Sequence, residues 1–186
     1  MTQTLTLTIS IDPGKYCTGV ALFREGLLVR ALLVRIPKVE DEEPVCRWVR
    51  MSAQVYKEVL RAANPQEGVS LSSSIGDLIS GTFRLACERM TIRPSRLEAS
   101  NAVADLQGTL GSIVAVLNPK ESVSYLPEQW KRQLPKDIAK GRVYTRLDVD
   151  EVLALEDSLD GIPQGLRHNV FDAVGIGLHS LDRRIF

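Results

Sequence analysis

Hydrophobic and polar residues alternate at the start of the chain and predict an antiparallel meander. Over residues 5–11, leucines and isoleucines alternate with threonines and a serine, and this period of two is typical of a strand. The apolar segments 18–23 and 27–36 predict two more strands, and the short link 24–26 predicts a hairpin turn between them. Asp12 continues the polar parity of the first strand, so its side chain is expected on the Thr/Ser face of the sheet.

The rest of the chain alternates between helical and strand patterns. Pro44 is expected to open a helix, and its apolar stripe is expected to comprise Val45, Trp48, Val49, Ser52, Val55, Tyr56 and Val59. A buried strand is predicted over 82–90 and a short strand over 121–125. Further helices are predicted from a capping box at 95–98 to about residue 117, from Pro127 to before Pro135, over 144–157 and from 167 to 184, with loops over 64–76 and 161–165.

This order of elements predicts an α/β fold in a single domain over residues 1–186, because the length suits one core. We expect a mixed five-stranded sheet, with its first three strands antiparallel and with helices on both faces. In the helix that ends near residue 117, Val103, Leu106, Leu110, Ile113, Val114 and Leu117 are expected to form the core face. Another side carries small residues, Ala104, Gly108, Gly111 and Ala115, which another element could approach closely.

Composition places the chain among ordinary soluble proteins. Hydrophobic residues make up 44% and charged residues 25%. The first residues lack the pattern of a signal peptide, and no apolar run approaches the ~18–20 residues that cross a bilayer. The three cysteines are widely spaced and fit neither a disulfide framework nor a zinc site. We therefore expect a reducing, cytoplasmic compartment and no membrane segment.

Charge is unevenly distributed although the formal net charge is zero. Residues 89–146 hold ten Lys or Arg and five Asp or Glu, whereas residues 147–160 hold six acids and no base. A neutral chain argues against a strongly basic nucleic-acid binder. The basic middle can still bind an anion locally, and solvated helix faces explain the same pattern equally well.

Three acids stand where different elements could bring them together. Asp12 ends the first strand, Glu88 ends the buried run "FRLAC", and Asp172 lies among apolar residues of the last helix. Each has a plainer interpretation: a turn aspartate, a strand meeting solvent, and a half-exposed acid beside a core stripe. Taken together, they could form the carboxylate cluster that Mg²⁺ prefers.

Four segments, in this order, resemble the RuvC-type Holliday-junction resolvases, crossover junction endodeoxyribonucleases of the ribonuclease H-like superfamily. "SIDPGKYCTGVALFREG" is similar to the family's first-strand motif, and "LACERM" is similar to the strand that carries its second acid. "LPEQWKRQLPK" with Lys140 resembles its Pro-x-x-x-Lys stretch, and "HNVFDAVGIGL" resembles its terminal helix.

The resemblance implies a metal-dependent, structure-selective endonuclease that cuts four-way DNA junctions and leaves 5′-phosphate and 3′-hydroxyl ends. Asp12, Glu88 and Asp172 would be catalytic and would bind two Mg²⁺ ions, for which Mn²⁺ could substitute. Relatives often carry another acid or a histidine about one turn before the last Asp, but this chain has Asn169 and His168 there. Asn169 is therefore the candidate fourth metal ligand, and His168 could orient a water, contact phosphate or be an ordinary surface histidine.

The resemblance also implies branched DNA as the partner and a homodimer as the active form. Trp130 could stack on an unpaired base, although a core position is the more ordinary use of tryptophan. The small-residue side of the 96–117 helix is a candidate face for pairing two copies. Candidate DNA contacts are Lys15, Lys131, Arg132, Lys136, Lys140 and Arg142, with Arg146 nearby.

Three alternative functions remain open from the sequence. A related nuclease could act on other branched DNA or on an RNA–DNA hybrid. A binding protein could recognise branched DNA without cutting it, which the Asn at position 169 would allow. The hexokinase–Hsp70 type of ATP-binding fold also begins with Asp and a glycine hairpin, but it needs two lobes, for which 186 residues leave little room.

Overall fold

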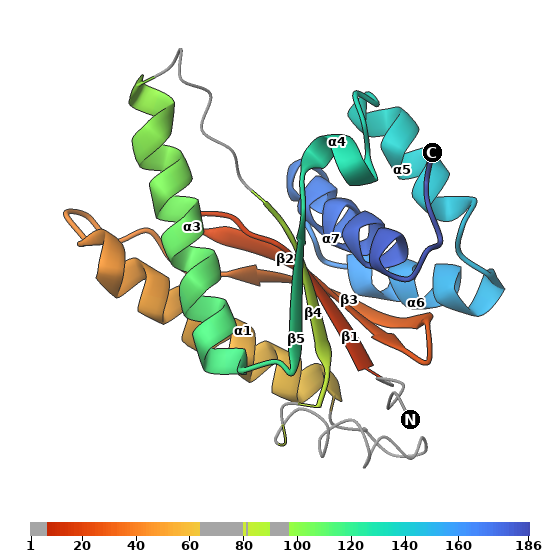
Figure 1. Cartoon of the computed structure of the whole chain (residues 1–186), viewed down its shortest axis with the longest axis horizontal. Coiled ribbons are helices and arrows are strands. Elements are labelled where there is room, and N and C mark those ends of the chain that lie inside the picture. The colour runs from red at the N-terminus through yellow and green to blue at the C-terminus, as the bar shows by residue number, and fades with distance from the viewer. Residues whose placement is uncertain (1–6, 64–79, 81, 90–96) are drawn as a thin grey trace.

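The chain folds around one five-stranded mixed sheet (Figure 1). The structure, a computed structural model, describes residues 7–63, 80, 82–89 and 97–186. The strand order is β3-β2-β1-β4-β5, with the first three strands antiparallel and with β4 parallel to both β1 and β5. The strands are β1 (Leu7–Asp12), β2 (Cys17–Arg24), β3 (Leu27–Arg35), β4 (Arg84–Glu88) and β5 (Glu121–Tyr125). The predicted meander and mixed sheet are confirmed, whereas the predicted loop 64–76 and the residues that open the predicted capping box lie outside the described residues.

The hairpin between β2 and β3 is turned by Glu25 and Gly26. Both residues have a positive φ, of 51° and 84°, as a two-residue hairpin turn of the primed type requires. This turn matches the twist of the two strands, so the predicted link 24–26 joins them directly.

Helices cover both faces of the sheet, as predicted. One face carries α1 (Pro44–Ala63) and α3 (Leu97–Leu117), and the other carries α4 (Pro127–Trp130), α5 (Lys136–Tyr144), α6 (Val149–Leu159) and α7 (Arg167–Ser180) (Figure 1). Each face buries its own apolar cluster against these helices. None of the described helices is both long and apolar enough to span a bilayer.

The polar face of β1 lies under α7. Ser10 is fully buried, and its hydroxyl donates to the backbone oxygen of Ala173 at 2.7 Å. Leu7, Ile9 and Ile11 point the other way, into the cluster beneath α1 and α3. The predicted parity of this strand is therefore confirmed, and it directs Asp12 toward the α7 side.

The buried stripe of α1 is rotated relative to the predicted one. Ser52, Val55 and Val59 are buried as expected, but Val45 and Val49 are each 58% exposed. Arg47 is buried in their place because it pairs with an acid of α3. The expected stripe was wrong at its N-terminal end, where a charged residue faces the interior.

The predicted helix over 144–157 begins too early. Helix α6 contains its residues 149–157, whereas residues 145–148 separate α6 from α5, a helix that was not predicted. Asp148 caps α6, since the Glu151 backbone N–H donates to its carboxylate and the Glu151 carboxylate accepts from its N–H, both at 2.9 Å. The helix that begins at Pro127 also ends earlier than expected, at Trp130, and α7 ends at Ser180 rather than near 184.

The small-residue side of α3 is partly covered by the chain itself. A Cβ added to Gly108 would lie 2.4 Å from a ring carbon of Trp48 on α1, whereas nothing lies within 4 Å of such an atom at Gly111. Gly108 therefore serves internal packing. The expected core face is confirmed at Ile113 and Leu117, but the buried row toward the N-terminus continues through the polar residues Thr109 and Asp105.

Candidate active site

Asp12 and Glu88 leave the sheet side by side. Their strands, β1 and β4, are adjacent and parallel, and the pair Ile11–Cys87 precedes them in register. Both acids are nearly buried, with 8% and 7% exposure. The carboxyl ends of neighbouring parallel strands meet at one edge of a sheet, and α7 crosses this edge with Asp172 on it.

The ammonium of Lys131 lies between two of these acids. Its Nζ is 3.1 Å from Oδ2 of Asp172 and 3.5 Å from Oε2 of Glu88. Lys131 directly follows α4, so a third side of the site comes from this short helix. Among the residues that the structure describes, no three His, Cys, Asp or Glu side chains are close enough together to hold a single ion as they stand.

The three carboxylates act on one another electrostatically. Burial raises the pKa of Asp12 well above its usual value, and the negative charges of Asp172 and Glu88 raise it further, while Lys131 and Lys136 oppose the shift. Burial also raises the pKa of Glu88, against the effect of Lys131. Burial disfavours the charged form of Lys131, but Asp172 and Glu88 outweigh this and hold the pKa of that ammonium above its usual value. The cluster therefore favours a bound positive charge.

Trp130 fixes Glu88. Its ring N–H donates to Oε2 of Glu88 at 3.0 Å, and the side chain is fully buried. The ring packs on α7, where a Cβ added to Gly175 would lie 2.6 Å from it. The core position that was favoured for Trp130 is thus confirmed, and the alternative, stacking on a base, is wrong because the buried indole is not accessible to a nucleic acid.

The start of α7 is pressed against β2. A Cβ added to Gly19 would lie 1.9 Å from the backbone oxygen of Asn169, so only glycine permits this approach. Together with the bond from Ser10 to Ala173, this contact sets the distance between α7 and the sheet. The position of Asp172 therefore depends on small side chains on the strands below it.

The side chains of His168 and Asn169 bond to backbone oxygens three residues before them. Nδ1 of His168 lies 2.9 Å from the Gly165 oxygen, and the Asn169 amide donates to the Leu166 oxygen at 3.2 Å. Both side chains are half-buried. Their roles, a fourth ligand for Asn169 and water orientation for His168, stay predictions.

Comparison with solved structures shows that the whole fold is shared. No model of a protein family and no curated protein matches this chain. The structure of T. thermophilus RuvC in complex with a Holliday junction substrate superposes with a TM-score of 0.58 and 20% identity, covering 95% of this chain and 94% of that one. The chain has the RuvC fold. The yeast mitochondrial Holliday junction resolvase Ydc2 shares it at a TM-score of 0.52 and 11% identity, covering 96% and 80% of the two chains.

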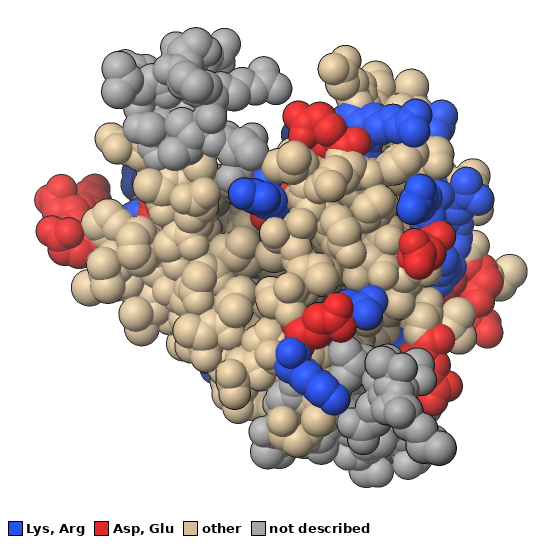
Figure 2. Space-filling view, viewed as in Figure 1, with Lys and Arg blue, Asp and Glu red and all other residues tan. Residues whose placement is uncertain are grey.

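Within this RuvC fold, the predicted DNA-contact residues are divided between two places. Lys131 and Lys136 lie near the acids, since both lower the pKa of Asp12. Figure 2 shows Lys and Arg gathered over α4 and α5, with acids among them. Lys15 lies elsewhere, with its ammonium 3.4 Å from a carboxylate oxygen of Asp105 on α3.

The remaining basic side chains near α5 are in contact with this chain's own aromatic and backbone groups. The guanidinium of Arg132 lies 4.3 Å from the centre of the Phe186 ring, and the ammonium of Lys140 lies 5.0 Å from that of Phe171. Arg142 donates to the Ile185 oxygen at 3.2 Å. These contacts do not bury Arg132, Lys140 or Arg142, all of which are exposed, so a phosphate could still reach them.

Two partners of the acids were missed from the sequence. Lys131 was predicted only as a DNA contact, and Trp130 was not expected to bond Glu88. One signal was present, because both residues stand in the "PEQWK" stretch that the resemblance singled out. Their contacts with β4 and α7 depend on tertiary packing that no local pattern encodes.

Proposed function

We propose that this protein is a metal-dependent, structure-selective endodeoxyribonuclease that cuts four-way DNA junctions. The observation that carries the proposal is that Glu88 and Asp172 converge on the ammonium of Lys131, with Asp12 at the end of the adjacent strand, near enough for their charges to raise its pKa. The RuvC fold adds support, because the solved structures that share it are described as a RuvC bound to a Holliday junction and as a Holliday junction resolvase.

The donor set fits a hard divalent cation such as Mg²⁺ or Mn²⁺. All three acids offer carboxylate oxygens, which these ions prefer, and the resident ammonium shows that the cluster accepts positive charge. Asp12, Glu88 and Asp172 would hold the ions, two per site. Such ions supply the Lewis acidity and charge neutralisation that phosphodiester hydrolysis needs.

The chain's own residues prepare the site for a phosphodiester. Trp130 holds one Glu88 oxygen in place through its ring N–H. Lys131 keeps the carboxylates paired until cations and substrate arrive, and its ammonium can then turn from Asp172 to a phosphate oxygen. Lys136, Lys140 and Arg142 on α5 and Arg132 just after α4 are exposed and would contact the DNA backbone.

Cleavage of an end-labelled synthetic four-way junction tests the proposal. We expect cuts in Mg²⁺ and none in EDTA, with products that a ligase reseals because they carry 5′-phosphate and 3′-hydroxyl ends. Asp12→Asn should lower the rate by a factor of 10² or more, on the order of one lost charge interaction at a metal site. Glu128→Gln changes an exposed acid on the adjacent α4 and should leave the rate unchanged.

Parallel substrates separate the alternatives. A plain duplex and an RNA–DNA hybrid are incubated beside the junction, and preferential cutting of the hybrid would assign a different nuclease function. Junction binding without cutting in either Mg²⁺ or Mn²⁺ would make the protein a binding module. Symmetric cutting requires two sites, so sedimentation of the junction complex should show two protein chains.

A further inference from the structure

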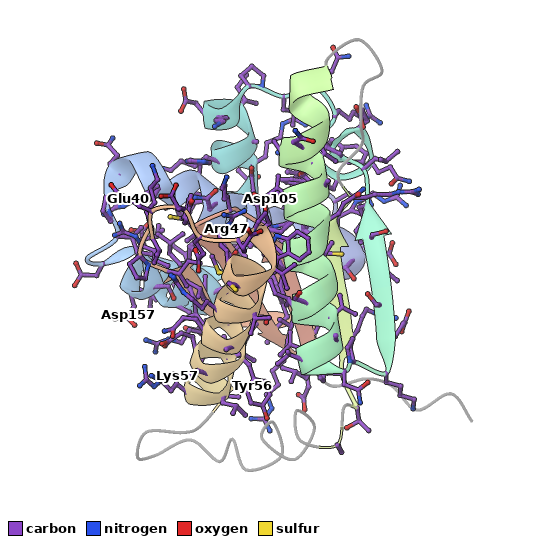
Figure 3. The ribbon with its side chains drawn as sticks, turned by 90° about the vertical axis from the view of Figure 1, so that its left-hand side faces the viewer. Glu40, Arg47, Tyr56, Lys57, Asp105 and Asp157 are labelled. Atoms are coloured by element: carbon purple, nitrogen blue, oxygen red, sulfur yellow. The ribbon has the colours of Figure 1, made fainter. Side chains whose placement is uncertain are left out.

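A second group of charged side chains lies on the opposite face of the sheet from the acid cluster, between α1 and α3. Its centre is Asp105, which is 8% exposed. Its carboxylate accepts from the Arg47 guanidinium at 2.5 and 2.6 Å and from the Trp48 ring N–H at 2.6 Å. Figure 3 shows Arg47 and Asp105 facing each other between the two helices. These donors hold the pKa of Asp105 below its usual value even though burial acts against them, so the carboxylate stays charged.

Lys15 joins this group from the loop that follows Asp12. Its ammonium lies 3.4 Å from Asp105, and the side chain remains 51% exposed. The loop is tightly turned, since a Cβ at Gly14 would lie 2.0 Å from the Cys17 oxygen. Lys15 is three positions after Asp12, so their Cα atoms are at most about 11 Å apart.

The local charge leaves Lys15 available to an anion. Arg47, buried and bonded through two contacts, already neutralises Asp105. Lys15 is therefore a second cation on a carboxylate that is already paired. Glu42, a further acid at this place, is bound by Arg50 at 2.8 Å. The charged side chains that line this place, Lys15, Arg47, Glu42 and Asp105, balance, so an anion would be bound by the exposed ammonium of Lys15 and not by a net positive surface.

Space for a ligand lies beside the Lys15 ammonium. A cavity of about 600 Å³ is lined by Lys15, Glu42, Arg47, Trp48, Asn101 and Asp105, among others. It opens beside the loop that bears Asp12, so a strand whose scissile phosphate lies at the acid cluster can continue past Lys15. None of Asp12, Glu88, Lys131 and Asp172 lines this cavity.

We infer that Lys15 and Asp105 form a second phosphate-binding point for the DNA substrate, on the α1–α3 side of Asp12. Lys15 contacts a phosphate that flanks the scissile one. Asp105 is a positioning residue, which holds the ammonium at the cavity and so reduces the number of conformations that the side chain loses when DNA binds. The inference rests on the proposed function for its substrate class.

The salt dependence of junction binding tests the role of Lys15. Affinity for a labelled four-way junction is measured in EDTA, where no cutting occurs, between about 50 and 200 mM salt. Lys15→Met should lower the slope of log affinity against log salt by about 0.9, the value for one lost phosphate contact, and Lys15→Arg should keep it. Lys57→Met, at an exposed position near the far end of α1 (Figure 3), is the matched control and should keep the wild-type slope.

The role of Asp105 is tested by a double-mutant cycle. Asp105→Asn should weaken junction binding several-fold when Lys15 is present and should have no further effect in the Lys15→Met background. Thermal unfolding of each variant shows whether it folds, and the Lys15→Met slope decides the main inference even if Asp105→Asn does not fold.

A Lys15→Met slope equal to that of the wild type would overturn the inference. If the wild type cuts the junction but this slope is unchanged, only the inference fails; if the wild type neither binds nor cuts, the proposed function fails.

Discussion

Asp12 has a carboxyl group whose ionisation is opposed by its surroundings. It is nearly buried beside Asp172 and Glu88, and burial is the larger cause of its raised pKa. A folded-state pKa above the unfolded value of about 3.9 means that the folded protein keeps this proton longer than the unfolded chain does. The stabilisation of the folded protein by this retained proton is complete at pH values below the unfolded pKa, and it is lost as the pH rises through the folded pKa.

Removing this charge should therefore stabilise the metal-free protein. We expect Asp12→Asn to raise the free energy of unfolding in EDTA by about 1 kcal/mol at pH 8, which corresponds to about 2–4 °C in melting temperature. The gain should shrink toward pH 4, where the wild-type carboxyl is protonated. Thermal unfolding at several pH values measures this, with Glu128→Gln as the control. A variant that melts below the wild type at pH 8 would contradict the expected like-charge repulsion.

Lys131 is the second residue with a testable charge. Its ammonium lies against Asp172 and Glu88, so it competes with any other cation for these oxygens. We expect Lys131→Met to raise the affinity for Mn²⁺ about tenfold, on the order of one nearby charge at partial exposure, and at the same time to slow cleavage. Electron paramagnetic resonance of free Mn²⁺ gives the affinity, and Arg132→Met, at the exposed neighbouring position, should leave it unchanged. Weaker Mn²⁺ binding by Lys131→Met would show that the lysine helps to build the site instead.

At the scale of elements, the candidate site depends on how closely α7 lies on the sheet and on Trp130. Gly175 gives the Trp130 ring its place, and a Cβ there would lie 2.6 Å from the ring. We expect Gly175→Ala to destabilise the fold by about 1–3 kcal/mol, the usual cost of overpacking, and to weaken the bond from Trp130 to Glu88. Gly111→Ala is the matched control, since that helical position is open, and it should stabilise the fold by about 0.5–1 kcal/mol. Chemical denaturation measures both, and equal stabilities for the two variants would contradict the packing argument.

The strands and helices also differ in how far they could be predicted from the sequence. The period of two in β1 correctly placed Asp12 on the face that α7 covers, because one side of that strand is uniformly apolar. The stripe predicted for α1 was wrong at its start because it followed the apolar residues Val45 and Val49. The burial of Arg47 depends on its bond to Asp105, more than 50 residues away along the chain, which no local pattern indicates. The break before α6 was readable, since Asp148 and Glu151 have the spacing of a capping box. The bonds of Trp130 and Lys131 to the acids were not readable, because they join segments whose approach is set by packing alone.

At the scale of the whole molecule, the sheet separates two charged groups that share one loop. The acid cluster lies under α7, and the Asp105 group lies between α1 and α3 on the other face (Figure 1). The loop from Asp12 to Lys15 passes from one to the other. A DNA strand bound at both would pass over the end of the sheet, so recognition of a bent or branched path would follow from the shape of the protein and not from contacts with bases.

The chain has two tryptophans, and each donates its ring N–H to a carboxylate of one of these two groups: Trp130 to Glu88 and Trp48 to Asp105. Indole fluorescence therefore offers a separate optical signal for each place. With Trp48 replaced by Phe, emission would report on ions entering at Glu88, and with Trp130 replaced by Phe, it would report on the strand reaching Lys15. The order in which metal and DNA arrive could then be followed in real time without any added dye.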